Sequence, residues 1–491
     1  MFILAMFMRR ATNLGLFQGC QLPNDGPYIS HLSYAEDVLF IGMWSEQNVI
    51  ALNRLLRWIS LVAGLKVNRS KCSLFGIGVN ETEVNQFASI VQCQVGTLPF
   101  THLGIPIDVN MKRAKYWKPV LDKFQSRLSK WKARFLSFAG RMTLVKAVLG
   151  SLPSYFLALF AAPKCVISKL EKIRRSFLWG KTDSGHKLRW VRWQLLQKSK
   201  KAGGMGVGSI QGYNFAMLAK WWWRFKSDPN QLWAKVVSAI HSDNGSNSTP
   251  PFFPLKRSLP GLWKDVGSVE AALAKIGINI KENLVVAGAE WKWQSDPNGS
   301  FSVKQVRIDI DRASSDSGIE NFVYKWNNWA TPKANFLLWR AILGKVASKV
   351  GLTHRGIPLS DCLCPRCWLH DEDPDHIFVN CLWSKCIWWN ILAWVRIRFP
   401  ADSNNLSSLI SYIDNNPGGK VWRKIVGMIA IATVWKIWSA RNKKVFEDIF
   451  IPVSKIVDQI KEETFMWVNN RANLKATSWG NWKSFDIIDL M

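Results

Sequence analysis

Cysteine and histidine side chains with the spacing of metal ligands lie near residue 370. Five of the nine cysteines fall between Cys362 and Cys386, which favours a metal site in a reducing compartment over a disulfide scaffold. Zn²⁺ selects thiolate and imidazole, and a closed set of four such ligands is structural. The expected ligands are a C-x2-C pair and a His–Cys pair, namely Cys364, Cys367, His376 and Cys381. Lower-ranked ligands of the same types are Cys362, His370 and Cys386, and the alternative without metal is a set of buried thiols with a core histidine.

The second group of residues that could do chemistry is an acidic pair near the N-terminus. Two β-rich runs, Ile29–Tyr34 and Val38–Ile41, flank Ala35-Glu36-Asp37, and this pattern predicts a hairpin with the acidic pair at its turn. Carboxylates on a rigid turn can bind Mg²⁺, which prefers oxygen ligands. Glu36 and Asp37 are therefore candidate catalytic residues, and a purely structural hairpin is the alternative.

The stretch around this hairpin resembles the catalytic Tyr-Ala-Asp-Asp hairpin of reverse transcriptases from plant non-LTR (LINE-type) retroelements. The segment Gly64-Leu65-Lys66-Val67-Asn68, with Lys71 after it, resembles the segment that follows the hairpin in that family. Leu103-Gly104-Ile105-Pro106 resembles the next family segment, with His102 in place of the usual Tyr. The resemblance implies an RNA-directed DNA polymerase that uses Asp37 and Glu36 with Mg²⁺.

Two departures from the family pattern predict that polymerase activity is impaired. The family has Asp-Asp where this chain has Glu36-Asp37. Two-metal catalysis holds its ions about 3.5–4 Å apart, and a misplacement of about 1 Å can cost roughly 100-fold in rate. The family also uses an earlier Asp on a palm strand, whereas Asp25 is the only acidic residue before Glu36 and lies in a turn-forming segment. We therefore expect the fingers and the first half of the palm to be missing; an active polymerase is the alternative.

A strongly basic composition points to a polyanionic partner, RNA or DNA. The formal net charge is +30 and the pI is about 9.9, and Lys and Arg side chains gain affinity for phosphates by counterion release. Eleven Lys or Arg residues and one acidic residue, Asp122, lie between Lys112 and Lys146, in a segment whose apolar residues have helical spacing. By resemblance this region is the thumb that grips a duplex. The expected nucleic-acid-binding residues are Lys123, Arg127, Lys130, Lys132, Arg134 and Arg141.

The second half of the chain resembles the zinc-binding domain that follows the polymerase in many plant elements. The resemblance covers Phe301–Pro400 and continues in Thr433–Trp438 with Ala440-Arg441-Asn442. Its other characteristic residues are Trp326, Pro332, Lys333, Asn335, Phe336, Trp339 and Arg340. The segment from Trp479 to Met491 shows no ribonuclease H carboxylate set, so we expect that domain to be missing.

The expected fold is α+β and predominantly helical, with helices over 2–16, 45–63, 166–178 and 422–445. The helix over 45–63 is amphipathic, with a cap signal at Ser45 and a C′ residue at Gly64, and we expect its apolar residues, Leu61 and Val62 included, to pack on the sheet. The helix over 166–178 is expected to be basic, with Lys169, Lys172, Arg174 and Arg175. The expected domains are a partial palm (1–110), a basic thumb-like helical region (111–240), a shortened linker (241–300), a small zinc-binding domain (301–400) and C-terminal helices (401–491). The glycines at 203, 204 and 206 predict a turn rather than a phosphate loop, since no Gly-Lys-Ser/Thr follows them.

No run reaches the length of a transmembrane helix, and the N-terminus lacks the features of a signal peptide. These observations predict a nuclear or cytoplasmic protein without a membrane partner. A third hypothesis treats the zinc module and the C-terminal helices as a zinc-dependent protein-interaction unit with no nucleic-acid role, although the charge argues against it.

Overall fold

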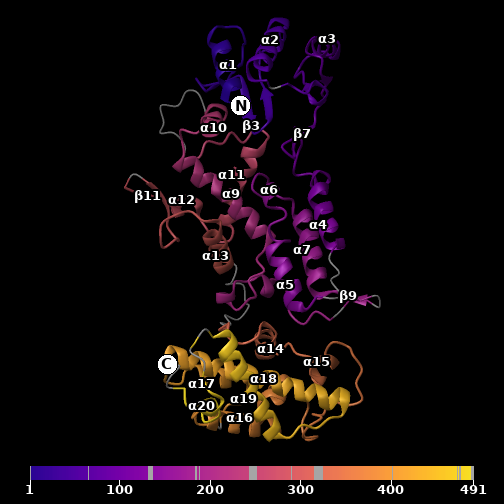
Figure 1. Ribbon diagram of the computed structural model, residues 1–491, viewed down its shortest axis with the longest axis vertical. Helices are drawn as coiled ribbons and strands as arrows, with labels where there is room; N and C mark the ends of the chain where they lie inside the picture. The colour runs from indigo at the N-terminus through magenta and orange to yellow at the C-terminus, as the bar shows by residue number, and fades with distance from the viewer. Residues whose placement is uncertain are drawn as a thin grey trace. The chain divides into compact units, whose positions relative to one another are not determined.

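The structure is a computed structural model of a predominantly helical chain (Figure 1). It describes residues 2–64, 66–130, 136–182, 185–186, 188–242, 252–288, 290–313, 324–400, 402–472, 474 and 477–487. The chain divides into two compact units. Unit 1 comprises residues 1–131, 147–174 and 208–318, and unit 2 comprises residues 132–146, 175–207 and 319–491.

Unit 1 combines helices with short two-stranded sheets. Its helices are α1 Phe2–Asn13, α2 Glu46–Ala63, α3 Glu81–Val91, α4 Lys118–Lys130, α6 Ser154–Leu157, α9 Ile210–Ser227, α10 Leu232–His241, α11 Leu262–Ala274, α12 Ile280–Asn283 and α13 Val303–Ala313. Its strands are β1 Cys20–Gln21, β2 Tyr28–Ile29, β3 His31–Tyr34, β4 Asp37–Phe40, β5 Ser73–Leu74, β6 Gln94–Val95, β7 Phe100–His102, β8 Ile105–Ile107, β11 Leu284–Ala287 and β12 Glu290–Trp293. Short 3₁₀ turns lie at η1 Arg69–Lys71 and η2 Ala114–Trp117.

Unit 2 is almost entirely helical. Its helices are α5 Phe138–Ala147, α8 Trp193–Gln197, α14 Pro332–Ile342, α15 Lys349–Thr353, α16 Leu382–Trp394, α17 Leu406–Asp414, α18 Lys420–Glu447, α19 Val453–Arg471 and α20 Trp479–Lys483. Its other elements are strands β9 Lys181–Thr182 and β10 Gly185–His186, the 3₁₀ turn η4 Lys200–Ala202 and the π-helical turn η6 His376–Asn380. The helix α7 Lys164–Trp179 is divided between the units after Arg174.

The predicted hairpin is present as β3 and β4. Tyr34 pairs with Asp37, so the turn consists of Ala35 and Glu36, and Ala35 has a positive φ of 48°. Asp37 therefore begins the second strand instead of lying in the turn. All six sheets in the described ranges have two strands, so this hairpin does not extend into a larger palm sheet there.

The helix predicted over residues 45–63 forms as α2 with the expected ends. The Ser45 side chain accepts a hydrogen bond from the Asn48 amide, and Gly64 ends the helix at a φ of 68°, as N-cap and C′ residues do. We expected its apolar face to pack on a sheet, but Ile59 packs in a cluster with residues of α1 and β4. Leu61 and Val62 are 71% and 59% exposed, so their predicted burial was wrong.

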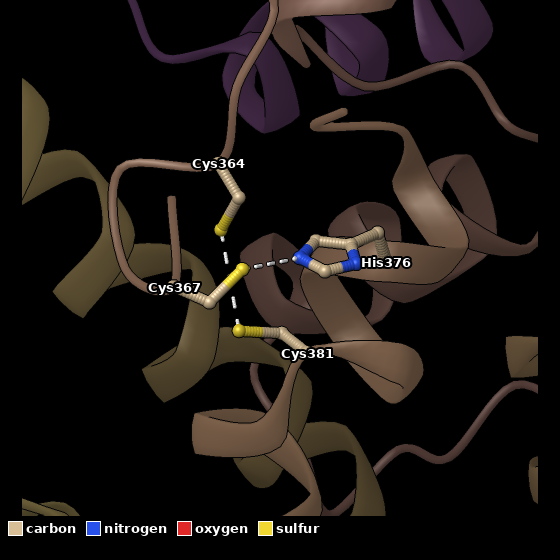
Figure 2. A group of neighbouring side chains, drawn as sticks. All are labelled: Cys364, Cys367, His376 and Cys381. Carbon is tan, nitrogen blue, oxygen red and sulfur yellow. Dashed lines mark hydrogen bonds between the residues drawn. The ribbon is translucent and has the colours of Figure 1, made fainter. Parts of the chain in front are cut away.

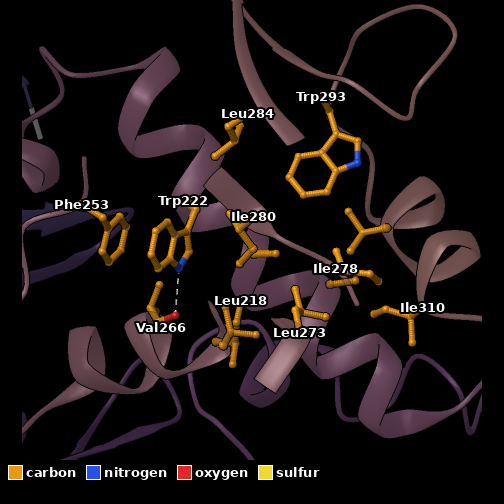
Figure 3. Packing of buried hydrophobic residues seen from close by; sticks show 14 of the residues in the cluster. Leu218, Trp222, Phe253, Val266, Leu273, Ile278, Ile280, Leu284, Trp293 and Ile310 are labelled. Carbon is orange, nitrogen blue, oxygen red and sulfur yellow. Dashed lines mark hydrogen bonds between the residues drawn. The ribbon is translucent and has the colours of Figure 1, made fainter. Parts of the chain in front are cut away.

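The core of unit 1 joins α9, α11, α13 and β12 (Figure 3). Trp222 of α9 is buried, its Nε1 donates to the Val266 carbonyl oxygen at 3.0 Å, and its ring stacks on Phe253 at 3.7 Å. Trp293 is also fully buried in this cluster. Residues 252–313, much of which we expected to be a linker, therefore supply a large share of this core, because their apolar side chains pack on α9.

In unit 2, the long helix α18 packs against α14, α16, α17 and α19 (Figure 1). The family-like segment around residues 326–340 is built into this packing. The Asn335 side chain donates to the Asn327 carbonyl oxygen at 2.8 Å, and the Asn327 side chain donates to the Lys424 carbonyl oxygen of α18 at 2.7 Å. Trp339 is fully buried, and its Nε1 donates to the Gly203 carbonyl oxygen at 2.7 Å. These characteristic residues therefore act as structural anchors.

Candidate metal centre and basic residues

A tight backbone turn positions the two cysteines of the C-x2-C pair. The Trp368 amide donates to the Cys364 carbonyl oxygen at 3.0 Å, and the Cys364 amide donates to the His370 carbonyl oxygen at 2.8 Å. Trp368 adopts a φ of 55° to close the turn. Both sulfur atoms consequently leave the backbone from one rigid knuckle.

The other two candidate ligands lie at the ends of η6: His376 is its first residue and Cys381 directly follows it. The His376 amide donates to the Asp373 carboxylate at 2.7 Å, which fixes the start of this π-helical turn. Cys381 occupies the position before α16, and its amide donates to the His376 carbonyl oxygen at 2.9 Å. The Ser384 hydroxyl donates to the Ile377 carbonyl oxygen at 2.6 Å and ties α16 to η6.

These two segments bring four ligand atoms together (Figure 2). The ligand atoms of Cys364, Cys367, His376 and Cys381 all lie within 4.8 Å of one another. Cys364 Sγ is 4.0 Å from Cys381 Sγ, and Cys367 Sγ is 3.3 Å from His376 Nε2. A tetrahedral zinc site with ordinary bond lengths has S···S and S···N edges of roughly 3.8 and 3.6 Å. The arrangement thus fits a tetrahedral ion with little movement.

The lower-ranked ligands lie outside this group of four. Cys362 Sγ contacts the Thr353 hydroxyl at 3.5 Å, and Cys386 is exposed on α16. The His370 ring lies 5.6 Å from the His376 ring, centroid to centroid.

The electrostatics of the four side chains suit a metal ligand set. Burial lowers the pKa of His376, which favours the neutral imidazole that binds metals. A hydrogen bond to Cys381 and burial raise the pKa of Cys364, and the same hydrogen bond lowers the pKa of Cys381. A bound zinc ion would release the thiol protons, because cysteine ligates zinc as the thiolate.

A buried ion pair fixes the loop between the two ligand pairs. Glu372 is fully buried, and its carboxylate accepts hydrogen bonds from Nε of Arg441 at 2.9 Å and from Nη2 of the same residue. The amide of Lys349 donates to the same carboxylate at 2.9 Å. Arg441 belongs to α18, so this pair ties the ligand loop to the central helix of unit 2.

A second arginine lies between the knuckle cysteines. Arg366 donates from Nη2 to the Ala440 carbonyl oxygen at 2.6 Å, and its guanidinium lies over the Trp383 ring at 4.2 Å. Its Nε and Nη1 are buried and have no hydrogen-bond partner among the described residues. Three thiolates and one Zn²⁺ carry a net charge of −1, so a guanidinium beside the centre would offset that charge. The two unpaired donors of Arg366, like the spacing of the four ligand atoms, fit a zinc–thiolate group.

Sequence reasoning did not identify the roles of Glu372, Arg366 and Arg441. Arg366 lies inside the C-x2-C pair and Arg441 lies in the Ala440-Arg441-Asn442 segment, so their membership in these motifs could have marked both as functional candidates. Glu372 carried no such signal, because acidic residues in a loop are usually exposed.

The predicted catalytic carboxylates do not form a comparable centre. Glu36 and Asp37 are both exposed. In the described ranges, the one group of three or more His, Cys, Asp or Glu ligands close enough to share an ion is the cluster at Cys364.

The predicted nucleic-acid-binding residues fall in different parts of the structure. Lys123 and Arg127 are exposed on α4, while the side chain of Lys130 and all of Lys132 and Arg134 lie outside the described residues. Arg141 lies on α5 in unit 2; burial lowers its pKa, and its Nε has no partner in the described structure. The predicted basic face of residues 166–178 needs one correction, because Arg174 is 1% exposed and pairs with Glu171 at 3.0 Å.

None of the described helices is both long enough and apolar enough to span a membrane.

Comparison with known proteins places the metal cluster in a family. Residues 301–388 match the family described as zinc-binding in reverse transcriptase. The chain is also 38% identical over 147 residues, 30% of its length, to an Arabidopsis thaliana protein named "Putative ribonuclease H protein", of which the match covers 24%. It is 31% identical over 97 residues, 20% of its length, to an uncharacterized mitochondrial protein of Arabidopsis thaliana, of which the match covers 63%. The chain thus spans less than two thirds of either relative.

The family match shows that the chain contains a reverse-transcriptase zinc-binding domain. It is, more particularly, a retrotransposon-derived protein. The resemblance stated from the sequence is confirmed at this level.

Proposed function

We propose that this chain is a LINE-type reverse-transcriptase product that binds RNA or DNA, holds one structural zinc ion and does not polymerise. The observation that carries the proposal is a reverse-transcriptase zinc-binding domain within a chain of formal net charge +30. Such a charge attracts phosphate backbones whatever their sequence. A zinc-dependent protein-interaction module would have no need of it.

Zinc has a structural role in this proposal. Cys364, Cys367, His376 and Cys381 would hold the ion, and all four protein positions would be filled, which leaves no open position for a substrate. The bound ion would cross-link the knuckle at Cys364 to the start of α16. Glu372 and Arg441 position the loop between the two ligand pairs.

Nucleic-acid binding is assigned first to the basic face of α4. Buried Trp117 at the end of η2 and buried Phe124 of α4 anchor this region in unit 1, and Lys123 and Arg127 are exposed. A face with one sign of charge repels itself unless a polyanion neutralises it. Lys130, Lys132, Arg134 and Arg141 remain part of the proposal from the sequence, as does the thumb-like role of residues 111–240.

We assign no polymerase activity to this chain, although Asp37 and Glu36 match the catalytic hairpin in type. Two-metal phosphoryl transfer needs carboxylates that converge on two Mg²⁺ ions. At the β3–β4 hairpin the described residues provide only two exposed carboxylates, Glu36 in the turn and Asp37 at the start of β4, and Glu36 replaces the shorter Asp.

Salt-dependent RNA binding tests the nucleic-acid part of the proposal. Fluorescence anisotropy with the zinc-loaded full chain should show log Kd rising linearly with log salt. Replacing Lys123 and Arg127 by Gln should lower that slope by about 1.4, since each lost single-strand phosphate contact accounts for about 0.7. A matched variant with Gln at the exposed Lys235 and Lys275 of the same unit removes the same charge and should change the slope by much less. Absence of salt-dependent binding by the unmodified chain would contradict the proposal.

A further inference from the structure

A cavity of about 520 Å³ lies within unit 2, away from the cysteine cluster. Its volume falls in the range of about 300–1,000 Å³ that small-molecule sites occupy. The end of α7, residues 189–195 and two segments near residues 343–355 form its walls. Neither the metal centre nor the basic face of α4 accounts for it.

The charged side chains that line this cavity all carry the same sign. They are Arg175, Arg189, Arg192, Lys345 and Arg355, with no Asp or Glu among the lining residues. None of the five forms an ion pair with a carboxylate that the structure describes. Protein surfaces usually mix the two signs. Five cations around one hollow, without a described counter-charge, favour the binding of an anion.

Two of the local arginines are held in place by the fold. Arg355 donates from Nη1 to the Arg189 carbonyl oxygen at 3.2 Å and from Nη2 to the Trp190 carbonyl oxygen at 3.3 Å. Its guanidinium lies over the Trp190 ring at 4.5 Å, and that of Arg340 lies 5.3 Å from the same ring. Burial and the neighbouring charge of Arg355 lower the pKa of Arg340 to about 10. The two like charges repel each other, and an anion bound beside them would offset this repulsion.

A third arginine adds an unsatisfied donor. Arg175 lines the cavity from the end of α7, and its Nε is buried without a hydrogen-bond partner in the part of the chain that the structure describes. Burying an unpaired donor destabilises the folded state. An oxyanion inside the cavity would give such a donor an acceptor.

Aromatic rings complete the lining. Trp179, Trp190 and Trp193 face the cavity together with Val191, Leu195 and Leu343. A simple phosphate ion would not contact the apolar side chains of this lining. A nucleotide would contact both the arginines and the apolar side chains, because its phosphate pairs with arginine and its base stacks on aromatic or guanidinium planes.

We propose that this cavity binds a phosphate-bearing nucleotide of a single-stranded RNA or DNA. This inference rests on the proposed function and deepens it, since it assigns a strand-binding site to the zinc-domain unit in addition to α4. Arg189 and Arg192 are exposed and contact the phosphates, while exposed Arg355 and half-buried Arg175 line the same cavity and complete the anion site. The apolar wall takes the base.

Fluorescence anisotropy with a labelled single-stranded RNA of roughly 12 nucleotides tests the inference; this length lies within the about 4–16 nucleotides of comparable sites. The test variant is Arg189→Gln with Arg192→Gln in the zinc-loaded full chain. The matched control is Arg398→Gln with Arg423→Gln, two exposed arginines of the same unit that do not line the cavity. Melting curves of both variants verify folding.

The test variant should weaken RNA binding at least about tenfold and lower the salt slope by about 1.4. The control should change Kd by less than about threefold, because distant exposed charges are screened beyond about 8 Å at physiological salt. An equal loss in both variants overturns the inference and leaves the proposed function standing. Absence of RNA binding by the unmodified chain overturns both.

Two further arms locate and identify the ligand. An RNA carrying 4-thiouridine should crosslink to peptides from residues 175–195 or 343–355, and crosslinks confined to other regions contradict the assignment. AMP serves as the probe for a free nucleotide and should compete only weakly with the strand. If AMP binds as tightly as the RNA, the site belongs to a free nucleotide and the assignment to a strand is wrong.

Discussion

Replacing Arg441 by Met tests whether the buried Glu372–Arg441 pair holds the metal ligands in place. Glu372 is fully buried, and the structure gives it three hydrogen bonds, two from Arg441 and one from the Lys349 amide. Met keeps the apolar stem of Arg441 but leaves the carboxylate with one donor. Breaking a buried pair in this way costs about 3–5 kcal/mol. Two lost charged hydrogen bonds at about 1.5–3 kcal/mol each give a similar sum.

The effect should reach the metal because Glu372 lies between the two ligand pairs. Residues that hold metal ligands typically change metal affinity about 10–100-fold when replaced. Competition with a chromophoric zinc chelator measures this affinity directly. Hydrogen exchange of the amides in α18 and η6 reports the free energy of local opening in the same variant.

Two companion variants separate this pair from general damage. Lys444→Met removes a charge from the same helix, where the Asp448 partner is exposed, and should cost less than about 1 kcal/mol. Glu372→Gln combined with Arg441→Met removes both charges and should cost less than Arg441→Met alone. If Arg441→Met leaves zinc affinity within about threefold, or if the double variant costs at least as much as Arg441→Met alone, the positioning role is refuted.

Three further outcomes follow from the same geometry. In metal analysis, Cys381→Ser should reduce bound zinc to far below one ion per chain, whereas Cys386→Ser should leave it at one. The reverse pattern would show that Cys386, and not Cys381, is the ligand. Chelation of zinc should lower the melting temperature of the unmodified chain, and an unchanged melting curve would deny the ion its structural role. Trp222→Ala should destabilise unit 1 by about 3–5 kcal/mol in hydrogen exchange of α9 and α11, whereas exposed Trp58→Ala should stay within about 0.5 kcal/mol; equal losses would contradict the burial-based explanation.

The sequence predicted those elements whose signals are local. Ser45 and Gly64 mark the ends of α2 because capping depends on residues within one turn of the helix. The β3–β4 hairpin and the turn at Gly203 follow from β propensity and glycine placement for the same reason. The spacing of Cys364, Cys367, His376 and Cys381 also pointed to four side chains that the structure brings together.

Features that depend on contacts between distant segments could not be predicted from the sequence. Leu61 and Val62 have the spacing of a packed face, but the described strands form no larger sheet to cover them. Arg174 was expected on a basic surface, yet it is buried against Glu171 and the Gly208 carbonyl oxygen. Glu372 and the arginine-lined cavity near Trp190 likewise arise from segments far apart in the chain. Periodicity describes one element at a time, so it cannot show which partner an element meets.

Primer extension on an RNA template measures whether the chain polymerises, under conditions where anisotropy shows that the primer–template is fully bound. We expect binding without product, in Mg²⁺ or Mn²⁺, for the unmodified chain and also for Glu36→Asp. Extension of the primer that disappears on Asp37→Ala would contradict the proposed function and show that the β3–β4 hairpin is a working catalytic centre.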